Sequence, residues 1–504
     1  MPQDSNQTRW IIKLPNEVFF DGSYATYEFS YFNLPQLYFE RGDSYFKKNL
    51  GVINTGLSNT LFRFLRDLAK VFTSKGTPIR YFLLFDGCYD QVDYNYEHIQ
   101  KCQNEGPALD NLFRYLYIYL DATVAKQFAD ELIRETENKF PHIEFNVYEA
   151  TPNLVSGQPI QNWPVLNHIE LLGIQTGWHY EGGRGHQANC FVVEVCWGID
   201  NPELPDYIAS NQTRYAYENG ENETLIDGPL TFSDKTHGTQ TLGVLVASGE
   251  KVTERDKVGI VPDATIAKLI STDMPLIRYE SPEAAAYKPL TYHEKPEAAL
   301  LKAICLASPG DIVLIEYEWT SGGLPFEYQE VGRHLIWYAT HCLDITVVEP
   351  AGNGIPKSIA NVDDQLLDFD SGAILVGAAY ESAASFMNGR NYSARAMLSK
   401  RFCFAPVPVA SIVCKDGKDV DYGQTSAAAA VIAGVACQIQ SIYKSMIMRY
   451  GRQDLCSYLP PYRLRELLCN PDSSALDFRV SDMLTGTMPD LPRIYEQISA
   501  MVNN

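Results

Sequence analysis

The feature that most constrains the fold is a run of small side chains near the carboxyl end of the chain, GQTSAAAAVIAGVACQIQ, at residues 423–440. Its composition predicts a helix that is apolar all round, and such a helix is stable only when it is buried. Alanine and glycine let it lie close to its neighbours. A chain of 504 residues is long enough to surround it with a large domain and to add one or two smaller units.

Upstream of this helix, short runs rich in β-branched residues alternate with helical segments from about residue 163 onward. The strand-like runs are CFVVEVCW, KVGIVPDATIAKLI, PGDIVLIEYEW, CLDITVVEP and GAILVGAAY. Strands that alternate with helices predict an α/β fold with a doubly wound, mostly parallel sheet. Functional residues are then expected in the loops at one edge of the strands.

The rest of the chain divides by pattern into three parts. Residues 1–111 form an N-terminal region whose fold and function are not legible from the sequence. In residues 112–151 the spacing of apolar side chains changes from a period of 2 to one of 3.6 and back to 2, which predicts a small β-α-β unit. Residues 152–163 contain Pro and Gly and are expected to be a linker, and residues 164–504 form the predicted α/β domain.

Composition excludes several classes of function. The formal net charge of −21 argues against a nucleic-acid partner, which needs clustered Lys and Arg. No stretch has the ~20 apolar residues of a membrane span. The 11 cysteines are scattered, without pairs at the CxxC spacing of a zinc site. We expect no required cofactor or metal, and a cytoplasmic location or export by a route without the usual signal peptide.

Three short segments carry residue types suited to acyl transfer. Ser426 begins the small-residue helix, where backbone N–H groups and the helix dipole favour charge developing on an attacked carbonyl. His237, in KTHGTQ, is expected at a loop-to-helix junction. Asn353 follows a buried strand and has a side-chain amide that can donate to an oxyanion. Taken singly, Ser426 is equally a helix cap and Asn353 a turn residue.

Together the motifs HGT, AGNG and GQTSAAAAVIAG, in this order, resemble those of the subtilisin-like serine peptidases. The resemblance covers about the last 340 residues. It implies Ser426 as nucleophile, His237 as general base and Asn353 in an oxyanion hole. It further implies a substrate cleft lined by Ser321, Gly322, Gly323 and Gly352.

The acid that should orient the histidine is left open by the sequence. The family carries an aspartate at the end of a strand, whereas this chain reads CFVVEVCWGID. One register, anchored on Gly198, puts Cys196 in its place. Another, anchored on Trp197, puts Glu194 there and resembles a bacterial subgroup with Glu in place of the Asp, after a GGRG turn like that of residues 182–185. We favour Glu194, since a buried carboxylate fixes the imidazole tautomer better than a thiol.

The resemblance implies a serine endopeptidase that hydrolyses a protein or peptide substrate, with processing of one specific protein partner as a narrower form. Glu316 or Glu318, before the Ser321 loop, would favour a basic residue ahead of the scissile bond. The alternative is an inactive relative that binds peptides without cutting them, which the missing aspartate supports.

The unit at 112–151 resembles the propeptide that precedes many of these peptidases. If it acts likewise, the 152–163 linker occupies the cleft or is cut by Ser426; otherwise the unit is a permanently attached domain. Calcium ligation needs converging oxygens that spacing alone does not place, so no calcium site is assigned. The oligomeric state is not legible.

Overall fold

The computed structural model describes residues 7–14, 64–65, 68, 81–83, 115–140, 146–150, 152–154, 172–195, 197–198, 201, 203–209, 214–215, 232–248, 258–276, 291–319, 323–353, 369–379, 400–407, 409–411, 420–470, 475–480 and 483–503. They fall into two compact units. The first contains the described residues up to 152 together with those of 273–298, and the second contains the remainder.

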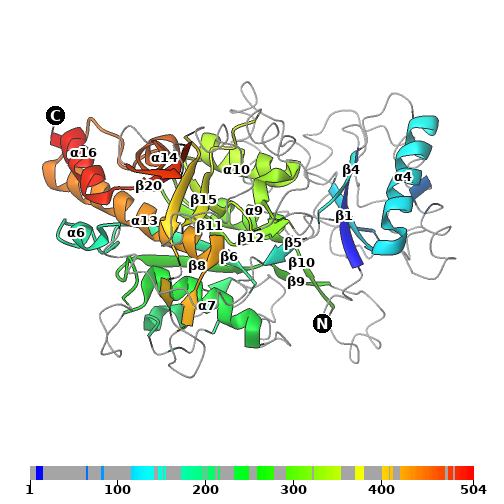
Figure 1. Cartoon of the computed structure of the whole chain (residues 1–504), viewed down its shortest axis with the longest axis horizontal. Coiled ribbons are helices and arrows are strands. Elements are labelled where there is room, and N and C mark those ends of the chain that lie inside the picture. Colours follow the sequence, from blue (N-terminus) through cyan, green and yellow to red (C-terminus); the bar gives the residue numbers. More distant parts are fainter. Residues whose placement is uncertain are drawn as a thin grey trace, which may run out of the picture. The chain divides into compact units, whose positions relative to one another are not determined.

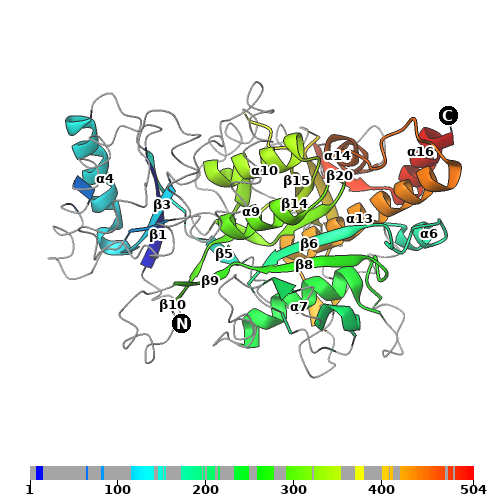
Figure 2. The same cartoon turned by 180° about the vertical axis from the view of Figure 1, so that it is seen from behind.

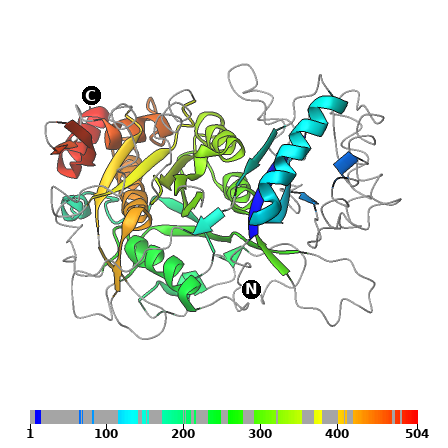
Figure 3. The same cartoon turned by 45° about the vertical axis from the view of Figure 1, so that its right-hand side comes forward.

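The first unit is built on a four-stranded antiparallel sheet in the order β2-β3-β1-β4. Its elements are β1 (Gln7–Lys13), β2 (Tyr81–Leu83), β3 (Tyr115–Asp121), α4 (Ala122–Lys139) and β4 (Asn146–Glu149). Helix α4 crosses the sheet (Figure 3). Its buried residues include Phe128 and Leu132. The predicted strand, helix and strand of residues 112–151 are confirmed as β3, α4 and β4.

The predicted boundary at residue 112 is wrong, because β1 from the first region lies between β3 and β4 in the same sheet. The unit also takes in β9 (Asp273–Leu276) and β10 (Thr291–Glu294), from the segment assigned to the large domain. A buried ion pair joins Arg9 of β1 to Glu297, and Arg9 Nε donates to the Ala150 carbonyl at 2.7 Å. Strands that pair across more than a hundred residues leave no local sequence pattern from which their pairing could be predicted.

The second unit contains a nine-stranded sheet within the described residues, in the order β19-β20-β16-β15-β14-β11-β6-β8-β7. All neighbouring pairs run parallel except β19 and β20. The strands are β6 (Asn189–Glu194), β7 (Arg214–Tyr215), β8 (Thr265–Ser271), β11 (Ile312–Ile315), β14 (Thr346–Pro350), β15 (Ile374–Ala379), β16 (Phe402–Pro406), β19 (Ala475–Val480) and β20 (Met483–Pro489). The predicted α/β class with a mostly parallel sheet is confirmed.

Helices cover both faces of this sheet. The helix α13 (Gln424–Tyr450) lies in front of the strands in Figure 1, whereas α9 (Pro296–Leu306) and α10 (Glu330–Cys342) lie in front in Figure 2. Helix α13 packs along the central strands and against α7 (Phe232–Val246) and α16 (Leu491–Asn503). It is buried from Thr425 to Tyr443, as its small side chains predict. At Gly434 an added Cβ would meet Ile260 at 3.0 Å, so neighbours approach closely.

The chain changes direction within the sheet at β6. It goes from β6 to β8 on one side and then crosses to β11 on the other. In open α/β sheets, such a switch point opens a crevice at the carboxyl ends of the strands. Glu194 ends β6 and Glu316 directly follows β11, so both carboxyl groups belong to this edge.

Two small sheets complete the second unit. One has the order β13-β12-β5, from β5 (Pro152–Leu154), β12 (Tyr317–Trp319) and β13 (Leu324–Pro325). The other pairs β17 (Val409–Ser411) with β18 (Val420–Tyr422), which leads into α13. The first three residues of the predicted linker therefore form a strand.

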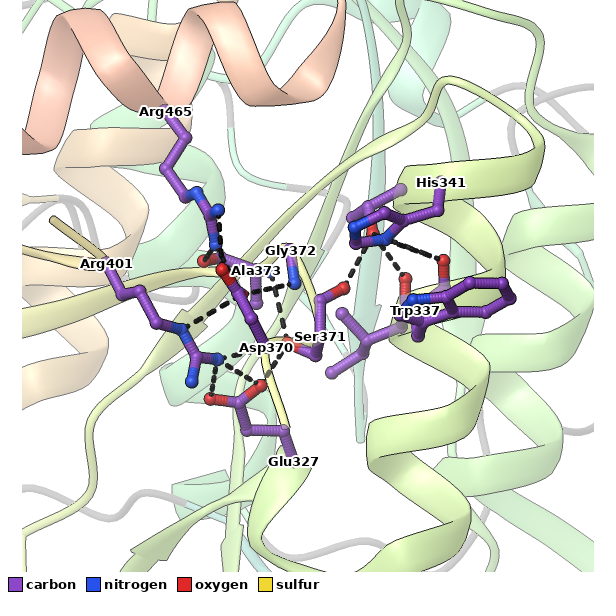
Figure 4. Close-up of polar contacts among 11 residues, drawn as sticks. Glu327, Trp337, His341, Asp370, Ser371, Gly372, Ala373, Arg401 and Arg465 are labelled. Carbon is purple, nitrogen blue, oxygen red and sulfur yellow. Dashed lines mark hydrogen bonds and ion pairs between the residues drawn. The ribbon is translucent and has the colours of Figure 1, made fainter. Parts of the chain in front are cut away.

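A cluster of charged side chains, with the buried pair Arg401 and Glu327 at its centre, lies at the amino ends of β15 and β16 (Figure 4). Arg401, at the start of β16, donates to both carboxylate oxygens of Glu327 at 2.6 and 2.8 Å, and Ser371 Oγ also donates to this carboxylate. The Glu327 N–H donates to Glu349 of β14 at 3.1 Å. Asp370 links Arg401 to Arg465 of α14 (Pro461–Cys469). The cluster fixes β14, β15 and β16 relative to one another.

Candidate active site

Ser426 lies in the first turn of α13, directly after a sharp change of chain direction. Strand β18 ends at Tyr422, Gly423 is extended, and Gln424 has φ of 62°. A side chain in this left-handed region costs about 1–3 kcal/mol and persists where the surroundings hold it. The Ser426 side chain is fully buried at the N-terminus of the 27-residue helix, where the dipole favours negative charge.

His237 and Glu194 form a buried hydrogen-bonded pair. His237 Nδ1 lies 2.7 Å from Glu194 Oε2, and the Val195 N–H donates to the other carboxylate oxygen at 2.9 Å. Both carboxylate oxygens are therefore bound, and the carboxylate fixes the proton of the imidazole on Nδ1. Cys196, the other candidate for this position, lies outside the described residues. His237 stands inside α7 rather than at its junction with a loop, because that helix already begins at Phe232.

Asn353 is held by three hydrogen bonds in the turn after β14. Its Oδ1 accepts from Thr425 N at 3.1 Å and from Thr425 Oγ1 at 2.7 Å, and its own N–H donates to Glu318 Oε2 at 2.7 Å. A backbone N–H can only donate, so the atom that faces it is the oxygen. The opposite amide nitrogen, Nδ2, is buried and has no hydrogen-bond partner in the described structure. A spare donor therefore lies on the side chain that binds Thr425, the residue directly before Ser426.

The turn that carries Asn353 depends on a close backbone approach. Gly352 has φ of 91°, and a Cβ there would lie 1.9 Å from the Gly323 carbonyl oxygen. Gly323 and Gly352 thus lie together, and the substrate cleft that they are expected to line stays a prediction. Ser321 and Gly322, also predicted to line it, fall outside the described residues.

Glu318 and Glu316 differ in their surroundings. The Glu318 carboxylate binds the Asn353 main chain, so it supports the turn. Glu316 is fully buried, and neither of its oxygens has a hydrogen-bond partner of normal geometry within the described residues. Burial and the Glu194 carboxylate raise the pKa of Glu316 well above its usual range, while Ser426 opposes the rise. The sequence suggests Glu316 or Glu318 as a wall of the specificity pocket, and this stays a prediction; it does not indicate that Glu318 supports the Asn353 turn.

Tyr422 is a further polar group of the site, and the sequence did not single it out. Its hydroxyl lies 2.9 Å from Thr241 Oγ1 and 3.4 Å from His237 Nε2. The two rings meet edge to face, with centroids 5.4 Å apart. Burial raises the pKa of Tyr422 well above its usual range, and nearby Glu316 and Glu194 add to the rise, against weaker effects of Thr241 and Ser426. Its place directly before GQTS was the available signal.

No group of three or more His, Cys, Asp or Glu side chains in the described parts of the chain is arranged to hold a metal ion. Among the same residues, α13 alone is long and apolar enough for a membrane span, and its apolar window is entirely buried in the protein. No family model matches the chain, and no curated protein matches it.

Several solved structures are similar to this chain at low identity. A mutant of the protease domain of PatA has 13% identity and a TM-score of 0.41, covering 63% of this chain and 96% of that one. The prenylagaramide maturation protease PagA has 16% identity and a TM-score of 0.41, with coverages of 65% and 99%. MycP1 from Mycobacterium smegmatis has 15% identity and a TM-score of 0.40, with coverages of 69% and 88%. At these scores the function must be argued from the side chains of this chain.

Proposed function

We propose that the chain is a serine endopeptidase of the subtilisin-like type that hydrolyses peptide bonds with Ser426, His237 and Glu194. The observation that carries the proposal is the buried 2.7 Å contact between His237 Nδ1 and Glu194. A carboxylate bound there keeps the proton on Nδ1, so Nε2 is left as the base. It also stabilises the imidazolium that forms when Nε2 takes a proton.

In the proposed reaction, Ser426 Oγ attacks the carbonyl carbon of the scissile bond while its proton passes to His237 Nε2. The tetrahedral oxyanion accepts hydrogen bonds from Asn353 Nδ2 and the Ser426 N–H. Collapse of the intermediate breaks the C–N bond, and Nε2 returns the proton to the leaving amine. Water then repeats the sequence on the acyl-enzyme. The unpartnered state of Asn353 Nδ2 supports its role, because it has a hydrogen bond to gain.

An inactive peptide-binding relative is the competing proposal, and it rested on the missing aspartate. Glu194 supplies a carboxylate at hydrogen-bond distance from His237, which removes that support. The two proposals differ in one outcome: only the peptidase converts a peptide library into new termini.

The test is cleavage of a peptide library, read by mass spectrometry, followed by kinetics on the best substrate. Ser426→Ala is expected to abolish turnover, and Asn353→Ala to lower kcat by about 10²–10³-fold. Glu194→Gln is expected to lose nearly all activity, because an amide N–H facing Nδ1 selects the tautomer with its proton on Nε2. Cys196→Ala is the matched control and should cost far less. Cleavage by Ser426→Ala at the wild-type rate would overturn the proposal.

A further inference from the structure

The Tyr422 hydroxyl lies against Thr241 Oγ1, and the second hydrogen bond of Thr241 assigns a direction to this contact. Thr241 lies one turn after His237 on α7, and its Oγ1–H donates to the His237 carbonyl at 3.3 Å, a common bond for threonine in a helix. A hydroxyl has one proton, so Thr241 Oγ1 accepts at its second contact, 2.9 Å from the Tyr422 hydroxyl. With this assignment the proton of Tyr422 points to Thr241, and its lone pairs are left to accept from Ser426, which also hydrogen-bonds to Tyr422, and from other donors.

These lone pairs meet His237 Nε2 at 3.4 Å. With Glu194 bound to Nδ1, the neutral imidazole has a lone pair on Nε2 as well. Two acceptors face each other, which matches a separation longer than a normal hydrogen bond. Once Nε2 carries a proton, the same geometry becomes N–H donating to oxygen. The contact therefore favours only the charged form of the histidine.

We propose that Tyr422 is the hydrogen-bond acceptor for protonated His237, and that Thr241 fixes it in this role. The proposal rests on the proposed function, since it concerns the imidazolium formed during acyl transfer. An interaction made in the transition state and not in the ground state raises kcat without tightening substrate binding. Tyr422 thus acts on the proton acceptor, and Thr241 acts through Tyr422 as a positioning residue.

The proton balance is simple. As the Ser426 Oγ–H bond breaks, the bond from Oγ to the carbonyl carbon forms, and Nε2–H donates to the Tyr422 oxygen. Tyr422 keeps its own proton on Thr241 throughout, and Nε2–H is later given to the leaving amine. The raised pKa of Tyr422 fits this role, because the phenol stays neutral while the histidine titrates. Glu194, Tyr422 and Glu316 are the titratable groups of the described site around His237 and Tyr422.

The experiment compares Tyr422→Phe, Thr241→Val and Thr241→Ser with wild type. We expect Tyr422→Phe to lower kcat about tenfold at unchanged KM and to move the acidic limb of kcat/KM about one pH unit lower. Thr241→Val frees the Tyr422 proton to donate to neutral Nε2, so the limb moves lower still. Thr241→Ser restores the hydroxyl and should return the limb toward wild type. Tyr443→Phe, which removes a hydroxyl bonded to the Cys456 carbonyl, is the matched control.

A second readout does not depend on peptidase activity. The pKa of His237 is measured by NMR of labelled imidazole, with His237→Gln to assign the signal. The same order is expected: wild type highest, Tyr422→Phe lower and Thr241→Val lowest. An unchanged His237 pKa in Tyr422→Phe, or equal values in Thr241→Val and Thr241→Ser, would refute the proposal. If the His237 pKa values keep this order but the wild type cleaves no peptide, the result would count against the proposed function alone.

Discussion

Glu316 is expected to lower the stability of the fold as the pH rises, and replacing it with glutamine should remove this effect. The side chain is fully buried beside Glu194, and burial raises the pKa of Glu316 well above its ordinary range. No positively charged side chain contributes to the shift in the pKa of Glu316. The folded chain therefore keeps the proton on Glu316 where the unfolded chain releases it.

The size of the effect follows from linkage. An unfolded glutamate ionises near about pH 4.3, and above it the unfolded state binds fewer protons than the folded state. The free energy of unfolding then falls by about 1.4 kcal/mol per pH unit, or about 2.7 kcal/mol from pH 5 to pH 7, as long as the folded carboxyl stays protonated. Glutamine has no such proton. Any packing cost of its amide is the same at every pH.

The assay is urea denaturation of wild type and Glu316→Gln between pH 4 and pH 8. The difference in unfolding free energy should be flat below the unfolded pKa and should then move in favour of the variant by about 1.4 kcal/mol per pH unit. Glu181→Gln, at an exposed position, controls for the loss of one carboxylate. Parallel profiles for wild type and Glu316→Gln would refute the reasoning, because they would place an ionised Glu316 in the folded chain.

Three further predictions concern stability, the oxyanion turn and processing. Arg401→Met should lower the unfolding free energy by about 3–5 kcal/mol in urea, because it leaves Glu327 buried without its cation, and adding Glu327→Gln should recover much of the loss. Gly352→Ala should lower kcat by displacing the Asn353 turn. The control Gly451→Ala is also at positive φ but has no atom within 4 Å of its Cβ, so it should lower stability and leave kcat unchanged. Equal kcat values in the two variants would contradict this. Intact mass should show wild type cut within residues 152–163 and Ser426→Ala uncut, in keeping with β5 beside β12; an uncut wild type would favour a permanently attached first unit.

The large sheet was predictable because its strands are local. Runs of β-branched residues between turns are buried on both faces of a parallel sheet, and β6, β11, β14 and β15 all lie where the runs predict them. The small side chains of α13 likewise predict that this helix is buried. By contrast, the place of β1 between β3 and β4 depends on partners far along the chain, and the predicted domain boundary failed there.

The candidate site shows the same division. Ser426, His237 and Asn353 stand in short motifs, so they could be named from sequence. The choice between Glu194 and Cys196 depended on the register of the strand. The structure identifies Glu194 as the partner of His237 through a contact between residues 43 positions apart in the sequence. The hydroxyl of Tyr422 contacts His237 although the two residues are 185 positions apart in the sequence. No rule based on local spacing predicts such a contact. The full burial of Glu316 could not be predicted, because an acidic residue on or beside a strand is usually solvated.

The most direct test of the central claim is covalent labelling of the nucleophile. Wild type treated with a fluorophosphonate probe is expected to gain one adduct, and peptide mapping should place it on Ser426. His237→Ala should label far more slowly, because the attacking hydroxyl loses its base. A wild-type chain that gains no adduct, or an adduct on Ser426 formed equally fast in His237→Ala, would contradict an activated serine at this site.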